Sequence, residues 1–247
     1  MVIAANQATP TNKPEMDWHN IRPVYQKLQT DFHVLTEPFG IFPSDEKNLD
    51  LSNLIGAIDV SDRALDVIVC LERRKQFSDK TIEFLAGPCE EAFEFFDEFA
   101  LTNEFHDRIG KLKSIIIRLE IQAEFCKKSN QVFEYTEAKR QANSQGEMIR
   151  NLVAEWECTG HLPVLILGEL STPKFEKFFF LACSMMPAID MVQDARADFE
   201  TGVIRVRPSV LLYLRLLAIF LVPAPLLLWR FPAPLNLIKY AISFLRV

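Results

Sequence analysis

The spacing of apolar residues along the chain predicts a protein built from α-helices. From Trp18 to Leu35, apolar side chains recur every three or four residues, which is the spacing of one helical face. Similar patterns predict further helices over residues 49–76, 78–99, 103–125, 133–156 and 173–199. Residues 163–170 have the composition of a strand, but no partner strand is evident, so a helix or a buried turn is expected there. We therefore expect an all-α protein, with two or three more helices in the apolar tail.

These helices are expected to form one domain. No internal repeat or low-complexity linker divides the chain. We expect a flexible polar leader over residues 1–15, a helical domain over residues 16–208, and apolar, basic helices over residues 209–247. The leader lacks the basic start and the long apolar run of a secretory signal.

Composition narrows the function classes. The 247 residues include 49% hydrophobic and 24% charged residues, as in a globular chain with a large core. The net charge of −6 argues against nucleic acid as a partner, because binding it needs a basic face. Five cysteines without a CxxC pair argue against a disulfide framework and indicate a reducing, cytoplasmic location.

The tail has a different charge from the rest of the chain. Residues 203–247 contain six basic residues and no acidic one. Within them, Val210–Trp229 is long enough to span a bilayer, but Arg215, Pro223 and Pro225 interrupt it. Three interpretations stay open: helices that close the core, a peripheral anchor on the cytoplasmic membrane face, and a membrane span.

Two helical stretches each carry aspartates on one face. They are Asp59, Asp62 and Asp66 in the first stretch, and Asp190, Asp194 and Asp198 in the second. Stacked carboxylates repel one another, and in helices that otherwise look buried they need a cation. Mg²⁺ meets that need with one or two carboxylates plus substrate phosphates. Two such helices face to face would hold Mg²⁺ ions that grip a diphosphate; the alternative is that each stripe is a solvated helix face.

The motifs around these aspartates resemble a known family. Residues 62–66 form a DxxxD element, and residues 194–202 form a DxxxDxxxG element that is followed by Arg205 and Pro208. This pair is similar to the class I isoprenoid (terpene) synthase superfamily, nearest to squalene and phytoene synthases. Residues 133–140, FEYTEAKR, resemble the EYxxxRRxxxG stretch of bacterial terpene synthases.

The resemblance implies a fold and an activity. The fold would be a single antiparallel helix bundle around a central apolar cavity. The activity would be Mg²⁺-dependent release of diphosphate from a prenyl diphosphate of the farnesyl or geranylgeranyl class, with Mn²⁺ as a substitute ion. The reaction would be terpene cyclisation or a squalene/phytoene-type condensation, catalysed by a lyase or a transferase.

The resemblance also implies roles for individual residues. All six aspartates would be metal ligands, and the catalytic ones among them would be Asp62, Asp66, Asp194 and Asp198. The substrate-binding residues would be Tyr135, Arg140, Arg205 and Arg207.

The chain departs from the family pattern at three positions. Asp190 stands where the family has Asn, Gln193 where it has Arg, and Val203 where an Arg follows the glycine. These departures leave a second reading open, a non-catalytic isoprenoid- or lipid-binding helical protein at the membrane surface. A third reading is a membrane-tethered structural protein whose acidic face docks a basic partner.

Overall fold

The computed structural model confirms that the chain is helical. It describes residues 21–68, 70–87 and 103–244, and no strand occurs among them. The predicted leader, residues 1–15, lies outside the described residues. The helices are α1 (Pro23–Thr36), η1 (Glu37–Phe39), α2 (Asp45–Val67), α3 (Leu71–Ala86), α5 (Asn103–Arg118), α6 (Gln122–Gln141), α7 (Gln145–Leu167), η2 (Gly168–Leu170), α8 (Pro173–Glu200), α9 (Val210–Leu221), α10 (Ala224–Arg230) and α11 (Pro234–Phe244).

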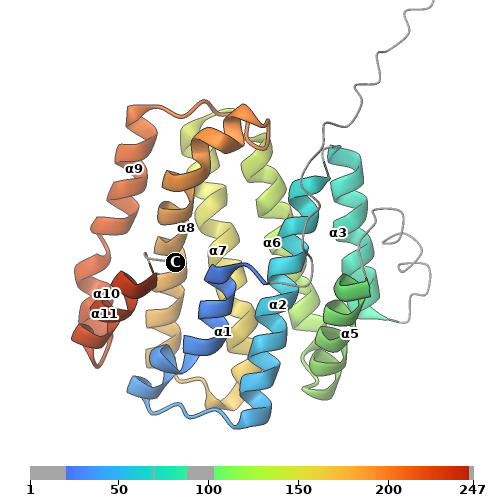
Figure 1. The fold of residues 1–247 in the computed structure, drawn as a ribbon, viewed down its shortest axis with the longest axis vertical. Coiled ribbons are helices and arrows are strands. Elements are labelled where there is room, and N and C mark those ends of the chain that lie inside the picture. Colours follow the sequence, from blue (N-terminus) through green and yellow to red (C-terminus); the bar gives the residue numbers. More distant parts are fainter. Residues whose placement is uncertain (1–20, 69, 88–102, 245–247) are drawn as a thin grey trace, which may run out of the picture.

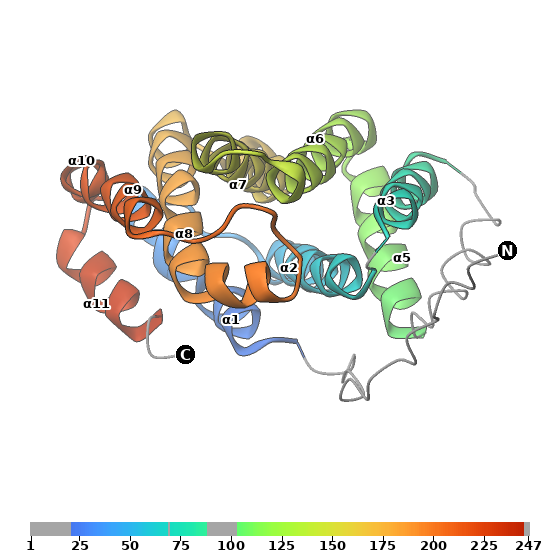
Figure 2. The same ribbon diagram turned by 90° about the horizontal axis from the view of Figure 1, so that it is seen from above.

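The helices form a bundle with an added layer at each side. Helices α6, α7 and α8 pack side by side, and α1 and α2 cover their inner face (Figure 1). Seen from above, α3 and α5 flank one side of this bundle and α9, α10 and α11 flank the other (Figure 2). The segment after residue 209 therefore lies along the outside of the bundle.

Three predicted long helices are each broken in two. The prediction of one helix over residues 49–76 is wrong, because α2 ends at Val67 and the backbone of Ile68 is extended. Arg74 of α3 fixes this break, since it donates to the Ile68 carbonyl and binds Glu137 of α6 through two nitrogens, at 2.8 and 2.9 Å. The predicted helix over residues 103–125 is wrong as well, because α5 ends at Arg118 and α6 begins at Gln122. The predicted helix over residues 133–156 is likewise two helices, α6 and α7.

Helices α7 and α8 each begin at a side-chain cap. Ser144 caps α7 by accepting a hydrogen bond from the Glu147 amide, and Thr172 caps α8 by accepting one from the Phe175 amide. Helix α8 covers the predicted range 173–199 almost residue for residue. Gly202, at φ 77°, ends it.

The buried side chains form two clusters. The larger lies between α1, α2, α3, α5, α6, α7 and α8, and its fully buried aromatic residues pack ring against ring. Phe178, for example, lies 4.8 Å from Phe231 and 5.2 Å from Phe39 between ring centroids. The smaller cluster joins α7, α8 and α9 through residues such as Met148, Met191 and Leu216. The described aromatic residues of these clusters therefore pack as core.

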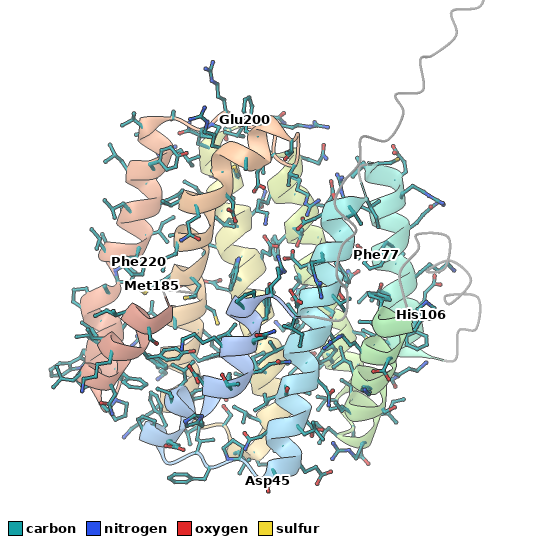
Figure 3. The ribbon with its side chains drawn as sticks, viewed as in Figure 1. Asp45, Phe77, His106, Met185, Glu200 and Phe220 are labelled. Carbon is teal, nitrogen blue, oxygen red and sulfur yellow. The ribbon has the colours of Figure 1, made fainter. Side chains whose placement is uncertain are left out.

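The C-termini of α2 and α8 lie at the same end of the bundle. Asp45, the first residue of α2, lies at the bottom of Figure 3, whereas Glu200, the last residue of α8, lies at the top. Both helices rise in the same direction in Figure 1, and α6 ends beside them. We call this the polar end of the bundle, defined by Asp62, Asp66, Lys139, Arg140 and Asp198.

Candidate functional site

The first aspartate of α2 is locked into ion pairs inside the protein. Asp59 is fully buried. One of its carboxylate oxygens lies 2.5 Å from Nε of Arg22, and the other lies 2.9 Å from Nη2 of Arg63. Both oxygens of Asp59 thus have a cationic partner, as buried carboxylates require.

The next two aspartates of α2 are more accessible. Asp62 is half-buried and accepts a hydrogen bond from Nη2 of Arg22 at 2.6 Å. The side chain of Asp66 is 45% exposed and lies 2.7 Å from Nη2 of Arg140. Burial, and next the carboxylate of Asp62, raise the pKa of Asp66 to about 6, although Arg140 and Arg22 oppose the shift.

Arg140 ties the end of α6 to the end of α2. It is buried, and besides Asp66 it donates to the carbonyl oxygen of Leu65 at 3.1 Å. Its Nε is also buried and has no hydrogen-bond acceptor among the described residues. The Nε–H group of Arg140 is therefore a hydrogen-bond donor at the polar end without an acceptor in the part of the chain that the structure describes.

Two of the aspartates of α8, Asp194 and Asp198, lie in its last two turns. Asp194 is exposed and Asp198 is half-buried. Burial, and next the Asp194 carboxylate, raise the pKa of Asp198, whereas Lys139 and Arg140 lower it and Asp62 raises it further. The side chain of Asp190 lies outside the described residues. The second stripe therefore reaches the polar end through Asp198.

Gly202 positions the end of this stripe. The amide of Val203 donates to the carbonyl of Asp198 at 2.8 Å, and the amide of Gly202 donates to that of Phe199 at 3.2 Å. This is a Schellman motif with glycine in the left-handed conformation just after the helix. The glycine of the DxxxDxxxG element thus has a local structural role, which is to end α8 next to Asp198.

The structure adds polar groups that sequence reasoning missed. Lys139 lies 2.7 Å from Glu155 of α7, and the hydroxyl of Thr136 donates to the other carboxylate oxygen of Glu155 at 2.7 Å. Burial alone lowers the pKa of Lys139, but the Glu155 carboxylate more than offsets this and holds the pKa above its usual value. A glutamate on the apolar stripe of α7, one turn after Leu152, is the sequence signal that could have found this pair.

Asp62 connects the helices at the polar end. It pairs with Arg22 at the start of α1, adds to the raised pKa values of Asp66 and Asp198, and supports the charged form of Lys139. Arg22 was not among the predicted site residues, and no motif in the sequence marks it. The two aspartate stripes therefore reach the same end of the bundle, where the carboxylate of Asp62 contributes to the raised pKa of Asp198.

Three predicted substrate-binding residues form no hydrogen bond or ion pair with this cluster in the described part of the chain. Arg205 and Arg207 are exposed, and they alternate with the buried residues Ile204 and Val206 in the segment after α8. Tyr135 is half-buried on α6, one helical turn before Lys139. Their predicted contact with substrate stays a prediction.

Carboxylates at the polar end are spread over two helices. Among the described residues, no three Asp, Glu, His or Cys side chains are grouped closely enough to hold a metal ion by themselves. Mg²⁺ is usually bound by one or two carboxylates together with water and substrate phosphates, so a group of three is not needed. The oxygen donors of Asp62, Asp194 and Asp198 fit this mode of binding.

Two hollows lie toward the opposite end of the bundle. One, of about 540 Å³, is lined by α2 and α5 and includes Glu46, Asp50 and Arg118. The other, of about 350 Å³, includes Lys47 and Leu167 near the end of α7. Neither hollow includes the aspartates of the polar end.

Comparisons of the chain with models of known protein families, with curated protein sequences and with solved structures found no significant match.

Proposed function

We propose that this chain is a Mg²⁺-dependent class I isoprenoid synthase that releases diphosphate from a prenyl diphosphate. The observation that carries the proposal is the meeting of the two aspartate motifs at one end of the helical bundle. Burial and the Asp194 carboxylate raise the pKa of Asp198 of α8 there, Asp62 of α2 adds to the rise, and Lys139 and Arg140 of α6 oppose it. Solvated faces on unrelated sides of the molecule would not show this coupling.

The electrostatics of the polar end favour a bound cation. Asp66 and Asp198 lie in the last turns of α2 and α8, where the helix dipole disfavours negative charge by about 0.3–1 kcal/mol each. Their raised pKa values reflect burial and neighbouring carboxylates. A divalent cation placed among these oxygens would relieve both penalties.

The donor set also suits the diphosphate of the substrate. Mg²⁺, or Mn²⁺ in its place, neutralises a diphosphate and makes it a better leaving group. In this proposal Asp62, Asp66, Asp194 and Asp198 hold the ions from two helices. The spare buried N–H of Arg140 donates to a phosphate oxygen.

The finer features of the proposal follow from the resemblance stated above. The prenyl chain, of the farnesyl or geranylgeranyl class, would lie in an apolar cavity between the helices. Tyr135, Arg205 and Arg207 would contact the substrate. The aspartate Asp59 is proposed to be structural, because both of its oxygens are already paired.

One observation favours a second function, which is binding of an isoprenoid lipid without catalysis. Asp62 and Asp66 already have arginine partners, Arg22 at 2.6 Å and Arg140 at 2.7 Å. If these pairs persist in the presence of Mg²⁺, the ion has no access to α2. The protein would then bind the lipid without cleaving the diphosphate.

Diphosphate release separates the two functions. The full chain is incubated with geranyl, farnesyl and geranylgeranyl diphosphates, with Mg²⁺ or with a chelator, and released diphosphate and extracted hydrocarbons are measured. The matched variants are Asp62→Asn and Asp198→Asn, with Asp107→Asn as control, because Asp107 pairs with Lys111 on α5 outside the polar end.

The proposal predicts Mg²⁺-dependent release that both site variants lose, by at least about a hundredfold, and that the control keeps. Prenyl diphosphate binding without release, equal in all variants, would instead support the binding function. Release that both site variants retain would overturn the proposed role of the polar end.

A further inference from the structure

The outer helices of the bundle carry apolar side chains on both of their faces. In α9, Leu212 and Leu216 are buried against α7 and α8. Val210, Leu214 and Leu217 lie on the opposite face and are exposed, and Leu221 continues this row. A helix that packs on the protein through one face alone would be polar on the other.

Helices α10 and α11 extend the same surface. Leu235, Ile238 and Ile242 are exposed along one face of α11, whereas Leu237 on its other face is buried. Trp229, near the end of α10, is 87% exposed. Figures 1 and 2 agree that α9, α10 and α11 together form the outermost layer at one side of the molecule. This defines an outer apolar surface, made of the exposed residues of α9–α11.

The segment that forms most of this surface is apolar and largely unburied. Val210–Arg230 is long and apolar enough to cross a membrane by length and composition, yet only 11% of its most apolar window is buried within the protein. A helix that merely closes the core would be mostly buried. Contiguous exposed apolar surface of this kind marks a place of contact with a partner or a membrane.

The charges on this layer indicate what the partner is. Arg215, Arg230 and Lys239 are exposed on α9, α10 and α11, and no acidic residue occurs after Glu200. Leucine, tryptophan and basic side chains together suit a membrane with anionic headgroups, which the cations approach while the apolar side chains enter the acyl region. A second copy of the chain would bring the same cations together without compensating acids.

The geometry points to a helix layer that lies in the membrane surface and does not span it. Helix α9 has 12 residues, or roughly 18 Å, against about 30 Å of bilayer core. The helix stops at Leu221, and a turn at Val222 and Pro223 separates it from α10. Leu216 and Phe231 are also buried in the protein, so a span would have to be pulled out of the core.

We therefore propose that the outer apolar surface of α9–α11 anchors the protein in the surface of an anionic membrane. The anchor rests on exposure and charge alone and does not depend on the proposed activity.

Vesicle flotation tests the anchor. The full chain is mixed with vesicles of phosphatidylcholine, or of phosphatidylcholine with phosphatidylglycerol, and the floating fraction is measured. The test variant is Leu214→Ser/Leu217→Ser, and the control variant is Leu49→Ser/Ile117→Ser. Leu49 lies on α2, and it is 62% exposed, against 57% for Leu214. Circular dichroism confirms that each variant is folded.

The anchor predicts flotation that prefers anionic vesicles and weakens with salt. Each leucine replaced on the surface should lower the partition coefficient about tenfold or more, and the control pair should leave it unchanged. Replacing Arg215 or Lys239 by Gln should lower it by about fivefold each.

A second measurement needs no destabilising change. Anionic vesicles should shift the fluorescence of Trp229 to shorter wavelength, and the shift should disappear in Trp229→Phe.

Three results would overturn the anchor. The first is that the protein binds no vesicle. The second is a dimer that Leu214→Ser/Leu217→Ser dissociates, in the absence of vesicle binding. The third is protein that resists an alkaline wash and is protected from protease on the far side of the membrane, as a membrane span would be.

Discussion

Burial and the Asp194 carboxylate raise the pKa of Asp198, on α8, and the carboxylate of Asp62, on α2, adds to this rise. Asp62 and Asp198 belong to helices that are far apart in the chain and that end at the same end of the bundle (Figure 1). Lys139 and Arg140 of α6 lower the pKa of Asp198 and so act in the opposite direction. The polar end thus holds carboxylates from two helices beside the cations of α6.

This relationship predicts that removing one carboxylate changes the titration of the others. In Asp62→Asn, the pKa of Asp66 should fall from about 6, because the second-largest cause of its upward shift is gone. The pKa of Asp198 should fall as well. Carboxyl carbon NMR over a pH series measures both values.

Asp107→Asn is the control for this experiment, since Asp107 pairs with Lys111 on α5. That variant should leave both pKa values unchanged. An unchanged Asp198 in Asp62→Asn would contradict the meeting of the two stripes, whatever the activity of the protein.

Stability should depend on pH through Asp66. Its pKa rises from 3.8 to about 6 on folding, so the unfolded chain releases this proton first as pH increases. The contribution of Asp66 therefore falls between about pH 4 and pH 6 and stays constant above. Asp66→Asn lacks this loss, so its free energy of unfolding relative to wild type should increase across that window. Urea denaturation at four pH values measures the difference, and a difference that shrinks with pH would contradict the raised pKa.

The aspartates of α2 should differ sharply in their importance for stability. Asp59 is fully buried between Arg22 and Arg63, so Asp59→Asn leaves buried cationic groups undercompensated and should cost about 3–5 kcal/mol. Asp31→Asn removes a more accessible pair with Lys27 and should cost no more than about 1 kcal/mol. Urea denaturation compares the two, and similar costs would contradict a structural role for Asp59.

The sequence was enough to predict the helical class and several helix boundaries. The regular apolar spacing and the Thr172-Pro173 start define α8, and the same spacing defines much of α5. The break at Ile68 could not be predicted, because it depends on Arg74 reaching Glu137 of α6, a tertiary contact that no local pattern encodes. The break between α6 and α7 did have a local signal, Ser144 followed by Glu147.

The candidate site was predictable only in part. Helical spacing correctly places Asp62 and Asp66 near each other on α2, and it cannot say which residues of other helices they face. Their arginine partners, Arg22 and Arg140, come from α1 and α6, and Arg22 carries no motif. The pair Lys139–Glu155 was missed because a helix stripe reports burial and not the partner across it.

Gly202 should matter for stability more than a glycine elsewhere. Its φ of 77° is left-handed, so Gly202→Ala should cost about 1–2 kcal/mol and loosen the backbone bonds at Asp198. Gly110→Ala on α5 is the control, because an added Cβ there meets nothing within 4 Å and should stabilise the helix by up to about 1 kcal/mol. Thermal unfolding checks the opposite signs, and two stabilising changes would contradict the Schellman motif.

Leu216 and Leu217 are neighbours in the sequence of α9, but they lie on its two opposite faces and have opposite environments. Leu216 is fully buried against α7 and α8, so Leu216→Ala should lower the free energy of unfolding by about 2–5 kcal/mol. Leu217 is exposed, and Leu217→Ala should change stability in solution by no more than about 0.5 kcal/mol. On anionic vesicles the order should reverse, since folded Leu216→Ala keeps the outer apolar surface and Leu217→Ala diminishes it. Urea denaturation and vesicle flotation of the same two proteins measure both orders. Equal losses of stability would mean that α9 is covered on both faces, which would contradict its place at the edge of the bundle and the proposed membrane anchor.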